Sequence, residues 1–276
     1  MVLVTKFDGR KQEFQKRKVI RTCLRMHASP EVAEKIADKI EKEIYEGIPT
    51  KKILKLIFKY LQEYRPEIRH QKDLREAICL LRPKPDFEEF INLLLKAYGY
   101  EVQPPQIVKG KCIEHEIDGI AKKDGKTFYV EVKHHFNPHT YTGIDVCLEA
   151  NSILEDFKEG FENGITPIKF DKVLIVCNTK FSEHAKRYAE CKNIQLLGWK
   201  NPEERGLERL IEEKKLYPIT FLKALSFEDE KKFGDAGIVL LKQLTELELE
   251  KIHLKTRISR KKLRVYIKKA TEILGS

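Results

Sequence analysis

The strongest constraint on the fold is the dipeptide Asp124-Gly125, because it separates two runs in which polar and apolar residues alternate. Asp-Gly favours a two-residue hairpin turn, whose twist matches that of the antiparallel strands it joins. We therefore predict strands over residues 112–121 and 127–133, paired with each other. Alternation along a strand sends neighbouring side chains to opposite faces, so each strand has one apolar and one polar face.

The two-residue turn also fixes the register of this hairpin. It places three polar pairs opposite each other: Asp118 with Glu131, Glu116 with Lys133, and Glu114 with His135. All six side chains are predicted on one face. The other face is predicted to be apolar and to pack against the rest of the protein.

Asp118 and Glu131 would repel each other across the hairpin unless a cation lay between them. Carboxylate oxygens are hard ligands that suit magnesium or manganese, and the carbonyl of Val132 could supply a further ligand. Lys133 lies on the same face and could act on a water and on a phosphate. The pattern indicates phosphodiester hydrolysis; the alternative is an exposed hairpin with a Glu116–Lys133 ion pair.

The neighbouring segments predict a mixed sheet covered by helices, which is an α/β fold. Asp86 is expected to cap a helix that runs to Gly99. Val173–Cys177 is a continuous apolar run, typical of a buried strand. The remaining predicted elements are a strand over 100–103, a helix over 144–161, a helix from Ser182 and a strand over 194–197.

Asp118 followed by Glu131-Val132-Lys133 resembles the signature of the PD-(D/E)XK nucleases, the restriction endonuclease-like superfamily. The element order over residues 86–201 is similar to its Mrr-like branch. The resemblance implies that Asp118 and Glu131 bind the metal and that Lys133 acts on the water and phosphate. Glu88 would be an accessory acid on the first helix. This chain has Ile117 where the signature often has proline.

Three histidines follow this motif: His134, His135 and His139. Their functional interpretation is phosphate contact or metal binding. The alternative is that they are ordinary residues at the rim of a loop.

Residues 1–82 are predicted to form a separate, mostly helical domain that begins with a hairpin at Asp8-Gly9. The pattern up to Lys18-Val19 resembles the ATP-cone, a regulatory nucleotide-binding module. This implies a site for ATP or dATP built from four residues: Lys6, Gly9, Arg10 and Lys18. Cationic side chains and a glycine that permits close approach suit a triphosphate. The alternative is a small basic domain that binds DNA or a partner.

Residues 202–276 are predicted to be helical and basic. Residues 249–260 resemble a helix-hairpin-helix element, which contacts the DNA backbone through helix N-termini and cations. A helical cap on the sheet or a dimerisation bundle are the alternatives. Arg82-Pro83-Lys84-Pro85 is interpreted as a short linker after the first domain, because two prolines exclude a continuous helix.

The formal net charge of +10 favours a polyanionic partner such as DNA. The six cysteines form no CxxC pair, and no apolar run is long enough to span a membrane, so we expect a cytoplasmic protein. One active site per chain suggests a homodimer for double-strand cuts. The predicted function is a metal-dependent DNA endonuclease in restriction or repair; the alternative is a non-catalytic DNA-binding or nucleotide-sensing protein.

Overall fold

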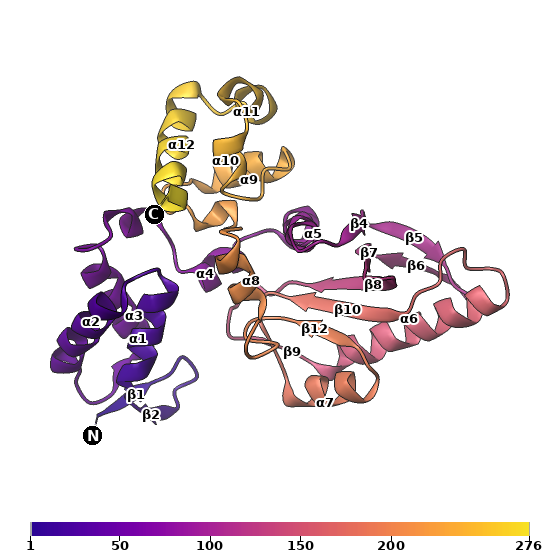
Figure 1. Ribbon diagram of the computed structural model, residues 1–276, viewed down its shortest axis with the longest axis horizontal. Helices are drawn as coiled ribbons and strands as arrows, with labels where there is room; N and C mark the ends of the chain where they lie inside the picture. Colours follow the sequence, from indigo (N-terminus) through magenta and orange to yellow (C-terminus); the bar gives the residue numbers. More distant parts are fainter. Residues whose placement is uncertain (1, 276) are drawn as a thin grey trace. The chain divides into compact units, whose positions relative to one another are not determined.

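The computed structural model describes residues 2–275. The chain divides into two compact units: Met1–Gln71 with Thr271–Ser276, and Lys72–Ala270. Figure 1 shows the helices and strands of both units.

The first unit contains a small sheet and three main helices. Its elements are β1 (Leu3–Thr5), β2 (Lys11–Glu13), α1 (Lys16–Arg25), α2 (Pro30–Glu43), β3 (Ile48–Pro49), α3 (Thr50–Leu61) and the short η1 (Pro66–His70). The hairpin predicted at Asp8-Gly9 joins β1 to β2, and Gly9 takes the positive φ of 80° that the turn requires. β3 pairs with β1 in parallel, which the sequence did not predict. Apolar residues of all three helices pack beneath the sheet.

The second unit is built on a five-stranded mixed sheet in the order β12-β10-β8-β7-β4. Its strands are β4 (Glu101–Gln103), β7 (Gly119–Lys123), β8 (Lys126–Lys133), β10 (Lys172–Cys177) and β12 (Gln195–Leu197). β8, β10 and β12 are parallel, whereas β4, β7 and β8 are antiparallel neighbours. The predicted α/β mixed sheet is confirmed.

The predicted hairpin register is right near the turn and wrong beyond it. Lys123 pairs with Lys126 and Gly119 with Val130, as expected. At Asp118 the strand breaks. The preceding residues form a separate strand, β6 (Glu114–Ile117), which pairs with β5 (Gln106–Lys109). The predicted Glu116–Lys133 and Glu114–His135 pairs are therefore wrong, because Glu116 faces Ile107 and Glu114 faces Lys109.

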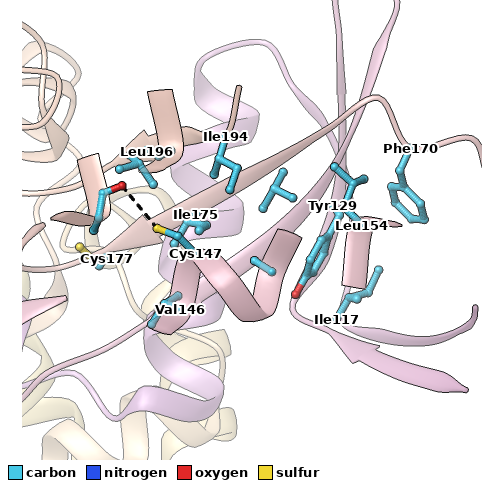
Figure 2. Close-up of a cluster of buried hydrophobic side chains, with 14 of the residues drawn as sticks. Ile117, Tyr129, Val146, Cys147, Leu154, Phe170, Ile175, Cys177, Ile194 and Leu196 are labelled. Carbon is cyan, nitrogen blue, oxygen red and sulfur yellow. Dashed lines mark hydrogen bonds between the residues drawn. The ribbon is translucent and has the colours of Figure 1, made fainter. Parts of the chain in front are cut away.

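One face of the sheet is covered by α6 (Ile144–Glu162) and α7 (Glu183–Cys191). Figure 2 shows Val146, Cys147 and Leu154 of α6 within the cluster that also contains Ile175 of β10. The Cys147 thiol donates a weak hydrogen bond to the Ala185 carbonyl at 3.8 Å. Ser182 caps α7 by accepting the Ala185 N–H, as the sequence predicts.

The opposite face near β7 is covered by α5 (Glu88–Ala97). A Cβ placed on Gly119 would lie 3.2 Å from the Gln103 carbonyl oxygen and 3.6 Å from the Asn92 amide oxygen of α5. The glycine thus permits close packing of this helix. The prediction that Asp86 caps the helix is wrong: its carboxylate is held by the guanidinium of Arg82 at 2.7 and 2.8 Å.

The rest of the second unit is mainly helical. It comprises α4 (Leu74–Cys79), η2 (Pro83–Phe87), β9 (Tyr141–Thr142), β11 (Lys180–Phe181), α8 (Leu207–Glu213), η3 (Ile219–Phe221), α9 (Phe227–Asp235), α10 (Gln243–Glu246), α11 (Leu249–Thr256) and α12 (Arg260–Gly275), whose last turn belongs to the first unit. Within residues 2–275, none of the helices combines the length and apolarity that crossing a bilayer requires. All six cysteines are free thiols; Cys112 and Cys191 are exposed and the other four are buried.

Candidate active site

Asp118 occupies the break between β6 and β7, and it is only 8% exposed. Its Oδ2 accepts the backbone N–H of Val132 at 2.8 Å. This side-chain contact ties the Asp118 carboxylate to the backbone near the end of β8. The backbone of β8 therefore holds the Asp118 carboxylate beside Val132, the residue after Glu131.

Glu131 lies on β8, and both of its carboxylate oxygens have partners. The hydroxyl of Tyr129 donates to Oε2 at 2.5 Å, and Nζ of Lys133 lies 2.8 Å from Oε1. The three residues alternate along one strand, so their side chains share a face. Tyr129 is fully buried, and burial together with the charge of Glu131 raises its pKa, so it remains a hydrogen-bond donor.

Lys133 is held between Glu131 and Glu149 of α6, whose Oε2 lies 4.0 Å from Nζ. Burial by itself would lower the pKa of Lys133, but the hydrogen bond and charge of Glu131 outweigh it and raise the pKa. The amine is therefore protonated at neutral pH. This favours a role as a cation that orients water and stabilises a phosphate over a role as a base.

Glu88 begins α5 and lies close to a lysine that the sequence analysis placed in a linker. The ammonium of Lys84 lies 3.2 Å from Oε1 of Glu88, 3.0 Å from Oε1 of Glu116 and 3.3 Å from Oδ1 of Asp118. Three carboxylates, from α5, from β6 and from the break before β7, thus surround one cation. The hydrogen bond to Glu116, together with the hydrogen bond to Glu88 and the charges of Asp118 and Glu88, raises the pKa of Lys84, which stays protonated.

Burial and the negative charge of Asp118 raise the pKa of Glu88 to about 7. The charged form of Glu88 is thus disfavoured in the folded protein. Lys84 opposes this rise but does not cancel it. A divalent cation at this position would relieve the repulsion between Glu88 and Asp118.

We predict that Glu88→Gln weakens the pH dependence of stability in EDTA. The raised pKa means that folding binds a proton between pH about 4.5 and about 7, so the free energy of unfolding falls as the pH rises through this range. Between pH 5 and pH 8 the wild type should lose about 1–3 kcal/mol more than the variant. Urea unfolding at both pH values measures this, and identical losses in the two proteins would contradict it.

The donor set fits a hard divalent cation, because Glu88, Asp118 and Glu131 offer only carboxylate oxygens. As the side chains stand, no group of three or more His, Cys, Asp or Glu residues between 2 and 275 converges on a metal position. Lys84 lies within 3.3 Å of both Glu88 and Asp118, and Nζ of Lys133 lies 2.8 Å from one oxygen of Glu131.

The chain after Lys133 is held by Asn178, which follows β10. Its Oδ1 accepts the N–H of His135 at 2.8 Å, and its Nδ2 donates to the carbonyl of His135 at 2.7 Å. Burial lowers the pKa of His134 to about 4 and also lowers that of His135. Both rings are neutral at pH 7, so a contact of His134 or His135 with phosphate would not be charge-assisted.

Sequence reasoning missed Lys84 and Tyr129. The spacing of Lys84 and Glu88 is that of an i,i+4 pair, but the two prolines made the segment resemble a linker. Tyr129 stands two residues before Glu131, which puts both on the same strand face. That spacing was a usable signal for a residue that orients Glu131.

The four residues predicted to bind nucleotide lie in the first unit. Lys18 of α1 lines a cavity of about 220 Å³ between β1, β2, α1 and α3, and its pKa is lowered by burial and by the nearby charge of Lys6. Lys6, Gly9 and Arg10 are not among the residues that line it. The guanidinium Nε of Arg10 donates to Asp8 at 2.7 Å across the hairpin turn.

The mixed sheet and the matching family model together define a restriction endonuclease-like domain of the PD-(D/E)XK superfamily. The family model described as Restriction endonuclease, Mrr_cat, matches residues 83–201. A second model, described as AF1548-like, C-terminal, matches residues 217–274.

The relatives narrow this class to one family. A protein of Archaeoglobus fulgidus described as uncharacterized is 38% identical over 182 residues, which are 66% of this chain and 98% of the relative. Another, from the same organism, is 48% identical over 42 residues, which are 15% of this chain and 89% of that protein. The crystal structure of a protein of unknown function, AF1548, has a TM-score of 0.59 and 36% identity, and the match covers 68% of this chain and 97% of that chain. The chain belongs to the AF1548-like family.

Proposed function

We propose that this protein is a metal-dependent endonuclease that hydrolyses phosphodiester bonds in DNA. The observation that carries the proposal is the grouping of Asp118, Glu131 and Lys133 where β7 and β8 separate, inside a domain similar to restriction endonucleases. The net charge of +10 supports a polyanionic substrate.

Asp118 and Glu131 would hold a magnesium or manganese ion, with the carbonyl of Val132 as a third ligand and Glu88 as an accessory acid. The metal would supply a Lewis acid and lower the pKa of a bound water. Tyr129 keeps Glu131 oriented through the hydrogen bond to Oε2. Lys133 remains protonated and stabilises negative charge on the phosphate.

We predict that Asp118→Asn lowers DNA cleavage by more than about 100-fold, because losing even a group that only orients a metal ligand costs 10–100-fold. Asparagine keeps an oxygen for the Val132 N–H but removes the charge, so the fold should persist. The measurement is the initial rate of cleavage of duplex DNA with manganese, with circular dichroism as the check on folding. Unchanged cleavage by the folded variant would remove Asp118 from the site.

The first unit supports a second, regulatory function, which is binding of ATP or dATP. The cavity that Lys18 lines, with Lys6 close enough to influence its charge, supports this proposal. Under this proposal, residues 1–82 are the regulatory domain, residues 86–201 are the nuclease domain and residues 202–276 contact DNA.

We predict that Lys18→Ala weakens ATP binding by about tenfold or more, because a charge-assisted hydrogen bond contributes roughly 1.5–3 kcal/mol. Calorimetric titration with ATP measures the change. Arg17→Ala, which removes an exposed neighbouring cation that does not line the cavity, is the control. Equal ATP affinity in wild type and Lys18→Ala would place any nucleotide elsewhere.

The C-terminal helices support DNA contact outside the active site. α11 and α12 are joined by residues 257–259, and exposed cations surround this connection: Lys255, Arg257, Lys261 and Arg264. Cations at the junction of two helices suit the phosphate backbone. Because each chain carries one site, double-strand cleavage would use two copies of the chain.

A further inference from the structure

We propose that Lys84 is a built-in counter-ion: its ammonium occupies the metal position in the metal-free protein, and the divalent ion must displace it to bind. This inference rests on the proposed nuclease function and adds that Lys84 competes with the metal ion for its site. It assigns a role to a residue outside the Asp118–Glu131–Lys133 motif.

Lys84 contacts two of the acids proposed to serve the metal, Asp118 and Glu88, together with Glu116. Its Nζ lies within 3.3 Å of Glu88, Glu116 and Asp118, and these acids come from α5, β6 and the break before β7. Asp118 uses its remaining oxygen for the Val132 N–H. The oxygen nearest Lys84 is therefore the one free to bind a metal.

An ammonium and a divalent ion cannot share this place. A metal–oxygen bond to Asp118 is about 2.0–2.6 Å long, so the metal would stand within a few ångström of Nζ. Two cations at that separation repel each other, most strongly where solvent is partly excluded. Glu88 and Asp118 are 7% and 8% exposed, so their charges are poorly screened.

Lys84 can leave without refolding of its segment. Arg82 anchors the backbone on one side by pairing with Asp86 and, at 2.7 Å, with Asp235 of α9. The side chain of Lys84 itself is 58% exposed. A long side chain that enters from solvent can rotate outward about its own bonds while the anchored backbone stays in place.

Removing the ammonium should therefore strengthen metal binding. Lys84→Met keeps the apolar stem but leaves three carboxylates without their cation, so we expect manganese to bind about tenfold more tightly. In EDTA the same variant should be less stable than wild type, and added manganese should raise its free energy of unfolding by more than it raises that of wild type. Lys84→Arg keeps a permanent cation and should bind manganese no more tightly than wild type.

The experiment is calorimetric titration of the full chain with manganese chloride, without DNA, for wild type, Lys84→Met, Lys84→Arg and Asp118→Asn. Lys232→Met is the matched control, since Lys232 forms an i,i+4 pair with Glu228 away from the site. Thermal unfolding in EDTA verifies that each variant is folded.

Tighter binding in Lys84→Met alone is the expected result. If wild type binds manganese through Asp118 and Lys84→Met binds no more tightly, the counter-ion role is wrong and the metal site stands. If no variant binds manganese in a way that depends on Asp118, the proposed metal site fails and the counter-ion role fails with it.

Discussion

Lys133→Met is expected to reduce DNA cleavage by about 10²–10⁴-fold while DNA binding is retained, because the loss of one preorganised catalytic charge has effects of this size. The protonated ammonium lies 2.8 Å from Glu131 and faces the proposed metal position. Methionine preserves the length of the side chain but cannot stabilise a phosphate charge. The measurement is a single-turnover cleavage rate beside an electrophoretic binding assay.

The control for this variant is Lys126→Met at the other end of β8. Lys126 is exposed and pairs with Lys123 across the hairpin turn, far along the strand from Glu131. Its loss removes the same charge from the same strand and should leave cleavage unchanged. Equal cleavage by wild type and Lys133→Met would show that the chemistry does not use this lysine.

Phe157→Ala should have the largest effect on stability, lowering the free energy of unfolding of the second unit by about 3–5 kcal/mol. The ring is fully buried in α6. It stacks on Phe170 at 4.9 Å between centroids and meets the rings of Tyr129 and His115 edge-on at 5.9 and 5.2 Å. Alanine would leave a cavity between α6 and the sheet that rigid strands cannot close.

Urea unfolding followed by tryptophan fluorescence measures this effect, because the single tryptophan, Trp199, is buried in the same unit. Phe161→Ala is the control on the same helix. Because Phe161 is 41% exposed, this variant should lower the free energy of unfolding much less. Similar losses for both variants would mean that α6 does not pack on the sheet through Phe157.

The nuclease core could be predicted in large part from the sequence, because its signals are local. Asp124-Gly125 set the register of β7 and β8 correctly for residues 119–130. The apolar run from Val173 became the buried strand β10, and Ser182 became a helix cap. Each of these depends on turn chemistry or periodicity within a few residues.

The break at Asp118 could not be predicted, because it depends on a contact between distant residues. Acidic residues stand at every second position from Glu114 to Asp118, on the same side as the predicted continuation of the hairpin, and this favours one long strand. In the fold, the Asp118 carboxylate accepts the Val132 N–H, and the residues before it pair with β5 instead. A side chain that accepts a backbone N–H can end the pairing of two strands, and the polar and apolar pattern of the sequence does not reveal this.

Lys84 illustrates the same limit within the site. The prolines on either side exclude a continuous helix, and Lys84 has an extended backbone with φ −122° and ψ 137°, but they do not indicate where its side chain points. Its carboxylate partners include Glu116 and Asp118, and the neighbouring Arg82 is held by Asp235, 153 residues away in the sequence. Distant contacts of this kind decide which charges meet in an active site.

The most direct test of the nuclease assignment is incubation of supercoiled plasmid with the wild type and magnesium or manganese, beside EDTA and the Glu131→Ala variant. Nicked or linear DNA is expected only when both the metal and Glu131 are present. Intact plasmid with every metal, with and without ATP, or equal cleavage by folded Glu131→Ala, would contradict it.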